Sequence, residues 1–287
     1  MHGIDSEMRA QNIPIAGREL KAASLASERL GTALPIAPLP NRKPIEGVYV
    51  GEDLSLHIRA WIQAKYGEKL KVKWGPGTVP VLVDGDLYAM SIPLLFGRVK
   101  IVAHPATHQQ KSDKHAGLPT SVCNVLDFIE GLTTVVSASL SQETLTSLVK
   151  LFCVALESFA LVERAPGSEL INAAQADLAS ASQSILAAPS HYGLSRWASL
   201  QATEKLYKAY ISAMKKPSEK THDLFKLNKS SCSLGFKGLP DDIMNTISCN
   251  PSVRYDGSES TLQQAVDAYW ASLQACGRIA KEMRSVV

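Results

Sequence analysis

The sequence predicts a mainly α-helical protein that carries a small α+β unit with a β-hairpin near its N-terminus. Apolar residues recur at i, i+3 and i+4 through most of the chain after residue 118, which is typical of amphipathic helices. Asp84-Gly85 stands between two short apolar runs, and glycine accepts the positive φ of a tight hairpin turn at no steric cost. No window holds about 18 uninterrupted apolar residues, so we expect no membrane span.

Residues 1–44 are expected to form one helix followed by a linker. The helix covers about residues 16–30 and ends at Gly31, because glycine favours the left-handed conformation that closes many helices. Three prolines in the segment 34–40 favour an extended chain there.

Residues 45–117 are expected to form a small α+β domain. A helix with Asp53 as its N-cap should end at Gly67, and the hairpin strands should cover 79–83 and 87–92. A third strand is predicted over 99–103. The polar segment 104–117 then predicts an exposed loop and a domain boundary.

Residues 118–287 are expected to form a helical domain. Val122, Val125, Leu126 and Ile129 fit one face of a first helix, and a longer helix is predicted over about 145–159. After Pro166-Gly167, helices are predicted over 169–187, 193–214, 222–231 and 261–285, with a short one at 240–247 that begins at Pro240.

The composition is typical of a globular protein kept in the cytoplasm. Of 287 residues 45% are apolar and 20% are charged, and the net charge of +3 does not by itself demand a nucleic acid partner. Lys and Arg are spread along the chain. The five cysteines have no Cys-x-x-Cys spacing, so we expect no zinc ribbon and no redox dithiol. We also expect no metal and no cofactor, and we expect Cys123, Cys153 and Cys276 to be buried. The N-terminus has no signal-peptide pattern.

Three short motifs in the last third of the chain could bind a ligand. Lys205 and Lys208 lie on one predicted helix and could contact phosphate, although lysines on a core helix are often simply solvated. His222 could bond a backbone carbonyl of the preceding turn or touch a ligand, while Thr221 or Asp223 caps the next helix. The guanidinium of Arg254, next to Tyr255, could bind phosphate while the ring packs on a base or on protein. It could instead pair with a carboxylate in the bundle or across a dimer.

The order of these motifs resembles the HEPN domain family over about residues 169–287. A lysine-bearing, alanine-rich helix, then Thr-His-Asp-Leu at 221–224, and then Arg254-Tyr255 before the final helix are similar to the pattern of that family. The resemblance implies an antiparallel helical bundle, a homodimer, and a role in prokaryotic defence or toxin–antitoxin systems.

The sequence departs from the catalytic members of that family. Their ribonuclease pair is an Arg followed after four to six residues by a His, and no His follows Arg254. Phosphate-loop, dinucleotide and serine-hydrolase motifs are also missing. We therefore expect a non-catalytic HEPN-like protein that binds a nucleotide, RNA or a protein partner through Lys205, Lys208, His222, Arg254 and Tyr255. The alternative is a metal-independent endoribonuclease in which His222 meets Arg254 or Arg196 across the fold or across a dimer.

Overall fold

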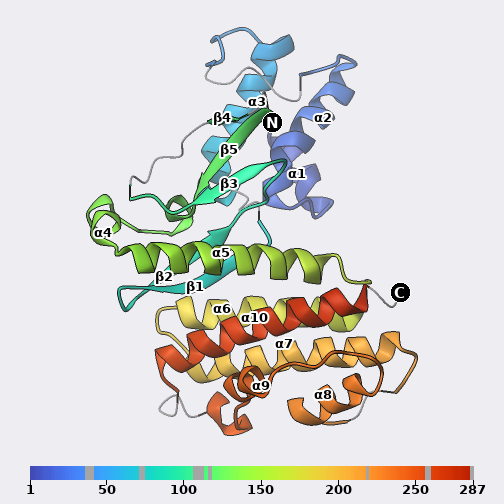
Figure 1. The fold of residues 1–287 in the computed structure, drawn as a ribbon. Coiled ribbons are helices and arrows are strands. Elements are labelled where there is room, and N and C mark those ends of the chain that lie inside the picture. Colours follow the sequence, from blue (N-terminus) through green and yellow to red (C-terminus); the bar gives the residue numbers. More distant parts are fainter. Residues whose placement is uncertain are drawn as a thin grey trace. The chain divides into compact units, whose positions relative to one another are not determined.

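The computed structural model describes residues 1–35, 42–70, 75–105, 113–115, 118–217, 220–255 and 260–284. The fold is mainly α-helical, as predicted (Figure 1). The chain divides into two compact units, Met1–Trp74 and Gly75–Val287. This division differs from the expected boundaries at 44 and 117, because the helix and the hairpin that we assigned to one α+β domain belong to different units.

The first unit is a cluster of three helices. They are α1 (His2–Ala10), α2 (Arg18–Leu30) and α3 (Gly51–Tyr66), with 3₁₀ turns at Ile15–Gly17 and Gly67–Leu70. Helix α2 was predicted and ends at Gly31 with φ 63°, whereas α1 was not predicted. The proline-rich linker falls mostly on residues 36–41, outside the described part of the chain.

Asp53 is not the N-cap of α3, in contrast to the prediction. Val50 takes that position, and Asp53 is the third residue of the helix. Its carboxylate instead accepts a bond from the Ile45 backbone N–H at 3.0 Å and pairs with Arg42 at 2.7 Å. The side chain therefore fastens the incoming chain to the first turn of α3.

A buried carboxylate holds the three helices of this unit together. Asp5 on α1 is 2% exposed, and its carboxylate accepts hydrogen bonds from the Tyr66 hydroxyl and, at 2.7 Å, from Lys65, both on α3. Arg9 lies 3.1 Å from the same carboxylate, and Arg18 of α2 lies 3.8 Å from it. Burial removes water from the carboxylate, which costs free energy. Because the carboxylate has several donors, its hydrogen bonds and ion pairs recover most of that cost.

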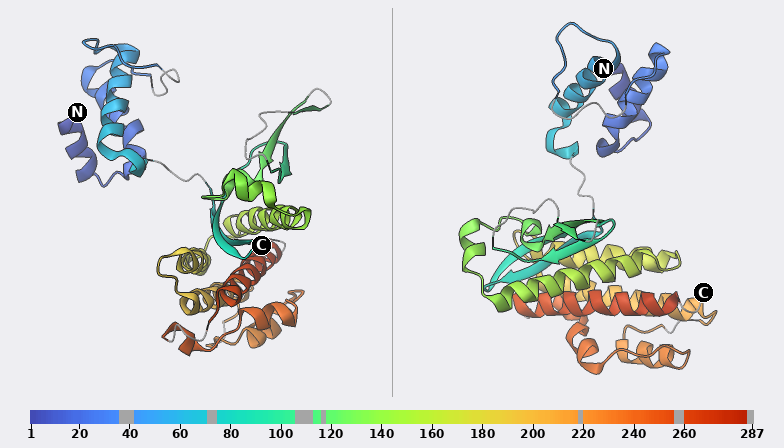
Figure 2. Two further views of the ribbon diagram at one scale, coloured as in Figure 1. Left: turned by 90° about the vertical axis from the view of Figure 1, so that its left-hand side faces the viewer. Right: turned by 45° about the horizontal axis from the view of Figure 1, so that its top comes forward.

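The second unit is built on four long helices, α5 (Gln142–Glu163), α6 (Glu169–Leu186), α7 (Tyr192–Ala213) and α10 (Leu262–Met283). Figures 1 and 2 show these helices lying lengthwise beside one another. Helix α7 packs against both α6 and α10, so most of its side chains are buried. Three of the four N-termini are capped by a hydroxyl, and Thr261 forms a full capping box with Gln264.

The predicted hairpin is present as β1 (Gly77–Val83) and β2 (Asp86–Ile92). Asp84 and Gly85 both have positive φ, 51° and 89°, as a type I′ turn requires. The hairpin is part of the helical unit. The Trp270 indole donates to the Pro80 carbonyl at 2.9 Å, and Ser182 donates to the Thr78 carbonyl at 2.6 Å.

The prediction of a helix through Val122–Ile129 is wrong. The segment forms strand β5 (Leu118–Asn124) and a 3₁₀ turn (Val125–Phe128), followed by the short helix α4 (Thr134–Ser139). Strand β5 pairs in parallel with β3 (Val99–Val102), and β4 (Asp113–His115) adds an antiparallel edge. Strand β3 was predicted, but its partner lies in the segment that helical spacing had assigned to a helix.

The expected loop at 104–117 contains strand β4, and residues 106–112 and 116–117 lie outside the described residues. Cys123 and Cys276 are buried as expected, and burial raises the pKa of these thiols to about 11 and about 12. Cys153 was expected to be buried too, but it is exposed, because it lies on the outer side of α5.

Helix α5 is long and apolar enough, by length and composition alone, to cross a membrane. It was the only helix of this kind among the described residues. In this fold it packs against α10 and against both hairpin strands, with Leu148, Phe152 and Ala155 buried. A core helix of a globular protein passes the same test.

Candidate functional site

The candidate site lies on the side of the bundle opposite the hairpin. That side carries α8 (Leu224–Cys232), α9 (Asp241–Ile247) and the 3₁₀ turn η4 (Pro251–Arg254), as Figures 1 and 2 show. Pro240 is the N-cap of α9, and not its first residue as predicted.

Helix α7 presents three side chains in a row toward α8 and η4. Trp197, Glu204 and Lys208 follow one another at seven and four residues, which places them on one helix face. Trp197 is 8% exposed and Glu204 is 5% exposed. A nearly buried carboxylate needs donors, and the fold supplies two.

Glu204 binds one cation of its own helix and the histidine that precedes α8. Its carboxylate accepts from Lys208 Nζ at 2.6 Å and pairs with His222 Nδ1 at 2.8 Å. Asp223 is the N-cap of α8 and accepts from the Phe225 and Lys226 backbone N–H groups. One of the two expected caps is therefore confirmed, and the partner of His222 is a carboxylate where we had considered a backbone carbonyl.

The turn η4 rests directly on the N-terminus of α7. A Cβ at Gly193 would lie 1.8 Å from the Val253 carbonyl oxygen, so only glycine permits this contact. Val253 is buried in the bundle core, and the Asn250 side chain caps the turn by accepting from Ser252 N–H at 3.0 Å. The position of Arg254 is therefore fixed by its neighbours in the chain.

The Arg254 guanidinium lies between two aromatic rings. Its central carbon is 4.4 Å from the centre of the Trp197 ring and 5.0 Å from the centre of the Tyr255 ring. Its Nε donates to the Pro251 carbonyl at 3.1 Å, and no carboxylate among the described residues pairs with it. Tyr255 is 82% exposed. Of the two roles considered from the sequence, pairing with a carboxylate of the bundle is not seen within the described ranges, and phosphate binding stays a prediction.

The structure brings four of the five expected ligand residues into one neighbourhood. His222 and Arg254 both pack against Trp197, with the His222 and Trp197 ring centres 6.2 Å apart. Lys205 is the exception, because its ammonium binds Asp177 of α6. Trp197 and Glu204 were missed as site residues. In the sequence, only their helical spacing from Lys208 indicates that they share a face with it. A row of side chains that merely pack in the core of the bundle has the same spacing.

Arg196 does not meet His222 through any contact in the described part of the chain. Its guanidinium lies 3.4 Å from Ser260 Oγ and 3.5 Å from the Ser248 carbonyl oxygen, and its buried Nε has no partner there. It supports the segment that leads away from α9 toward α10.

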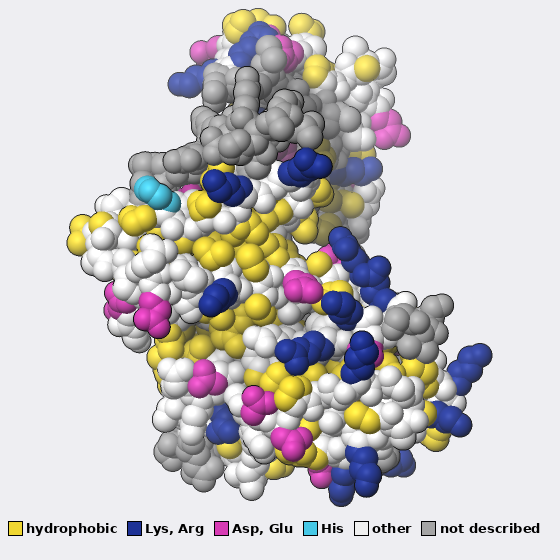
Figure 3. Space-filling model, in the orientation of Figure 1, with side chains coloured by type: hydrophobic (Ala, Val, Ile, Leu, Met, Phe, Trp, Pro, Cys, Tyr) yellow, Lys and Arg dark blue, Asp and Glu magenta, His cyan; other side chains and the backbone are white. Residues whose placement is uncertain are grey.

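Basic side chains that are spread along the sequence gather on one part of the folded surface. Figure 3 shows Lys and Arg over the end of the bundle where the C-terminal ends of α7 and α10 meet α8. The segment 215–237 contributes six Lys against Glu219 and Asp223, a net charge of +4. The exposed cations of this end, here called the basic end, are Lys215, Lys216, Lys220, Lys226, Lys229, Lys237, Arg278, Lys281 and Arg284.

The ion pairs at the basic end are loose. Lys226 lies 3.8 Å from Asp223, Lys237 lies 3.9 Å from Glu282, and Lys281 lies 4.0 Å from Glu157. Exposed pairs of this kind contribute about 0–1 kcal/mol each, so these cations are free to bind phosphate.

No cluster of metal-ligating side chains occurs within the described ranges. Comparison with known protein families, with curated proteins and with solved structures found no match for this chain.

Proposed function

We propose that the second unit binds single-stranded RNA without cleaving it. The observation that carries the proposal is the Trp197–Arg254–Tyr255 stack, in which a cation lies on a buried ring and next to an exposed one. Tyr255 offers a free ring face to an unpaired base, and Arg254 keeps two terminal nitrogens for phosphate oxygens.

The second support is the charge around this stack. Lys226 and Lys229 lie on α8, whose first turn follows His222, and the remaining cations of the basic end continue beyond it. A row of cations beside an aromatic platform is the arrangement with which proteins hold a flexible, unpaired strand. The resemblance to HEPN domains agrees with this ligand class and with a cytoplasmic homodimer in a prokaryotic defence or toxin–antitoxin system.

The proposal is tested by removing Arg254. We expect Arg254→Ala to weaken binding of a fluorescently labelled 12-nucleotide RNA at least about fivefold in an anisotropy titration, because a lost hydrogen bond to a charged phosphate costs roughly 1.5–3 kcal/mol. Arg98→Ala is the matched control, since Arg98 is exposed in the same unit but outside α7, α8 and η4. Equal affinities of Arg254→Ala and wild type would refute the proposal.

The same experiment addresses the ribonuclease alternative, which gains support from the packing of both His222 and Arg254 on Trp197. We expect the RNA to remain intact during the titration. Cleavage by the wild type that is lost in His222→Ala would identify a nuclease instead, with imidazole as the proton-transfer group.

A further inference from the structure

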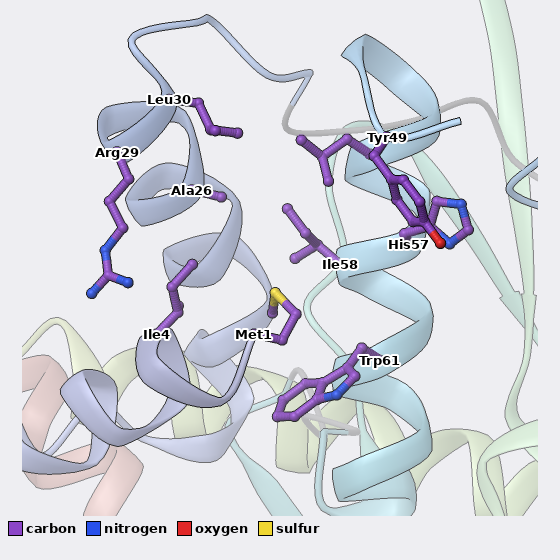
Figure 4. A pocket seen from close by; sticks show the side chains of 10 residues that line it. Met1, Ile4, Ala26, Arg29, Leu30, Tyr49, His57, Ile58 and Trp61 are labelled. Carbon is purple, nitrogen blue, oxygen red and sulfur yellow. The ribbon is translucent and has the colours of Figure 1, made fainter. Parts of the chain in front are cut away.

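The first unit contains a cavity of about 430 Å³ between its helices. Figure 4 shows Ile4, Ala26 and Leu30 on one wall, from α1 and α2, and Ile58 and Trp61 of α3 with Tyr49 on the other. A cavity of this size lies in the range of small-molecule binding sites. Its walls are mainly apolar, so its occupant must be mainly apolar as well.

Ion pairs and hydrogen bonds join the helices that form the walls of the cavity and so fix their spacing. Arg59 of α3 pairs with Glu19 of α2 at 3.0 Å, and Arg29 of α2 pairs with Glu7 of α1 at 2.5 Å. The Asp5 centre joins α1 to α3. Ala26 lines the cavity, and its small side chain leaves the cavity open between the helices that these contacts join. The cavity is therefore a feature of the folded unit that exists before a ligand binds.

The polar groups at the cavity restrict the charge of the ligand. Arg29 is occupied by Glu7, and His57 Nε2 lies 2.9 Å from the Ile45 carbonyl oxygen. The Tyr49 hydroxyl and the Trp61 indole N–H have no hydrogen-bond partner in the described ranges, so one or two neutral bonds are available. Arg29 is the one charged side chain among the lining residues, and a carboxylate in the cavity would have to compete with Glu7 for it while losing its own hydration.

The mouth of the cavity is apolar too. Leu30 is 57% exposed and Tyr49 is 61% exposed, and both line the opening. When an apolar ligand covers large exposed apolar side chains, their surface is removed from water, and this stabilises the complex. The charged lining residue already has a partner, the cavity has the volume of a small-molecule site, and its mouth is apolar. From these three observations we infer that the first unit binds a small uncharged apolar molecule, such as a medium-chain alcohol.

The test uses the full-length chain and the uncharged fluorescent probe 1-N-phenylnaphthylamine. We expect a saturable rise in fluorescence, and displacement of the probe by dodecanol at a concentration about tenfold lower than by dodecanoate. Ala26→Phe should fill the cavity and weaken probe binding at least about tenfold. Ala64→Phe should leave binding unchanged, because Ala64 is exposed on α3 away from the cavity.

Leu30→Gln is a second variant, for the case that Ala26→Phe does not fold. Leu30 is already half exposed at the mouth, so a polar side chain is tolerated there. We expect it to weaken probe binding about threefold or more while the helical circular dichroism stays unchanged. The inference is overturned by a wild type without saturable binding, by Ala26→Phe and Leu30→Gln variants that both bind like wild type, or by dodecanoate that displaces as well as dodecanol.

Discussion

Replacement of Asp5 by alanine should unfold the first unit and leave Gly75–Val287 folded. Removing one member of a buried charge network leaves the others without compensation, which costs about 3–5 kcal/mol. A folded unit of this length has a stability of only about 4–11 kcal/mol. Because Asp5 is 2% exposed and joins all three helices through Lys65, Tyr66 and Arg18, its loss removes much of that stability.

Hydrogen exchange read by mass spectrometry separates the two units in one experiment. We expect fast exchange throughout α1, α2 and α3 in Asp5→Ala, with α7 and α10 protected as in wild type. Glu28→Ala is the control, because Glu28 is an exposed acidic residue of α2 that makes no hydrogen bond or ion pair with the Asp5 carboxylate or its partners. If all three helices of Asp5→Ala exchanged as slowly as in wild type, the Asp5 carboxylate would not be needed to hold the first unit together.

The same carboxyl gives the first unit its response to acid. Desolvation by burial raises the pKa of Asp5, but hydrogen bonds from Lys65 and Tyr66 and nearby cations outweigh it, so the pKa lies below its usual value. A lowered folded pKa adds stability above the unfolded value of about 3.9, and this stability is lost as pH falls further. The first unit should therefore lose protection below about pH 4.

Gly193→Ala should disrupt η4 and destabilise the second unit. Two effects oppose each other: alanine improves helix propensity by up to about 1 kcal/mol, but its Cβ would stand 1.8 Å from the Val253 carbonyl oxygen. A backbone oxygen cannot move without moving the turn, and overpacking costs about 1–3 kcal/mol. We expect the clash to prevail, with a lower melting temperature and RNA affinity as weak as that of Arg254→Ala.

Gly167→Ala is the matched control for this substitution. A Cβ at Gly167 would meet no neighbouring atom within 4 Å, and Gly167 has no positive φ, so its replacement should change stability by less than about 0.5 kcal/mol. A Gly193→Ala protein with the wild-type melting temperature and RNA affinity would mean that the turn does not hold Arg254 in place.

The sequence correctly predicted the elements that depend on one or two neighbouring residues. The Asp84-Gly85 turn and the ends of α2 and α8 follow from single residues with defined φ or capping chemistry. The segment around Val122 was assigned wrongly because its apolar spacing fits a helix face, while its actual structure depends on pairing with β3, a distant strand. Pairing between distant strands leaves little trace in one sequence.

The candidate site shows the same limit. His222, Arg254 and Tyr255 were found as short motifs, but the contacts that organise them are not local. Glu204 meets His222 across a loop, and Trp197 of α7 meets Arg254 of η4, with α8 and α9 between them in the sequence. Lys205 was assigned to the site because it lies one turn from Lys208 on the same helix. Their carboxylate partners separate them: Lys205 binds Asp177 on α6, whereas Lys208 binds Glu204 on α7.

Binding of single-stranded RNA and of duplex RNA with the same number of nucleotides per strand tests the central claim most directly, because the duplex carries more phosphate charge and would bind more tightly if charge alone were recognised. An exposed Tyr255 ring can stack only on a base that is not already stacked in a helix, so we expect the wild type to bind a 12-nucleotide single strand about tenfold more tightly than a 12-base-pair duplex at the same salt concentration. Equal or tighter binding of the duplex would show that the basic end alone recognises phosphate, and would contradict the role assigned to the Trp197–Arg254–Tyr255 stack.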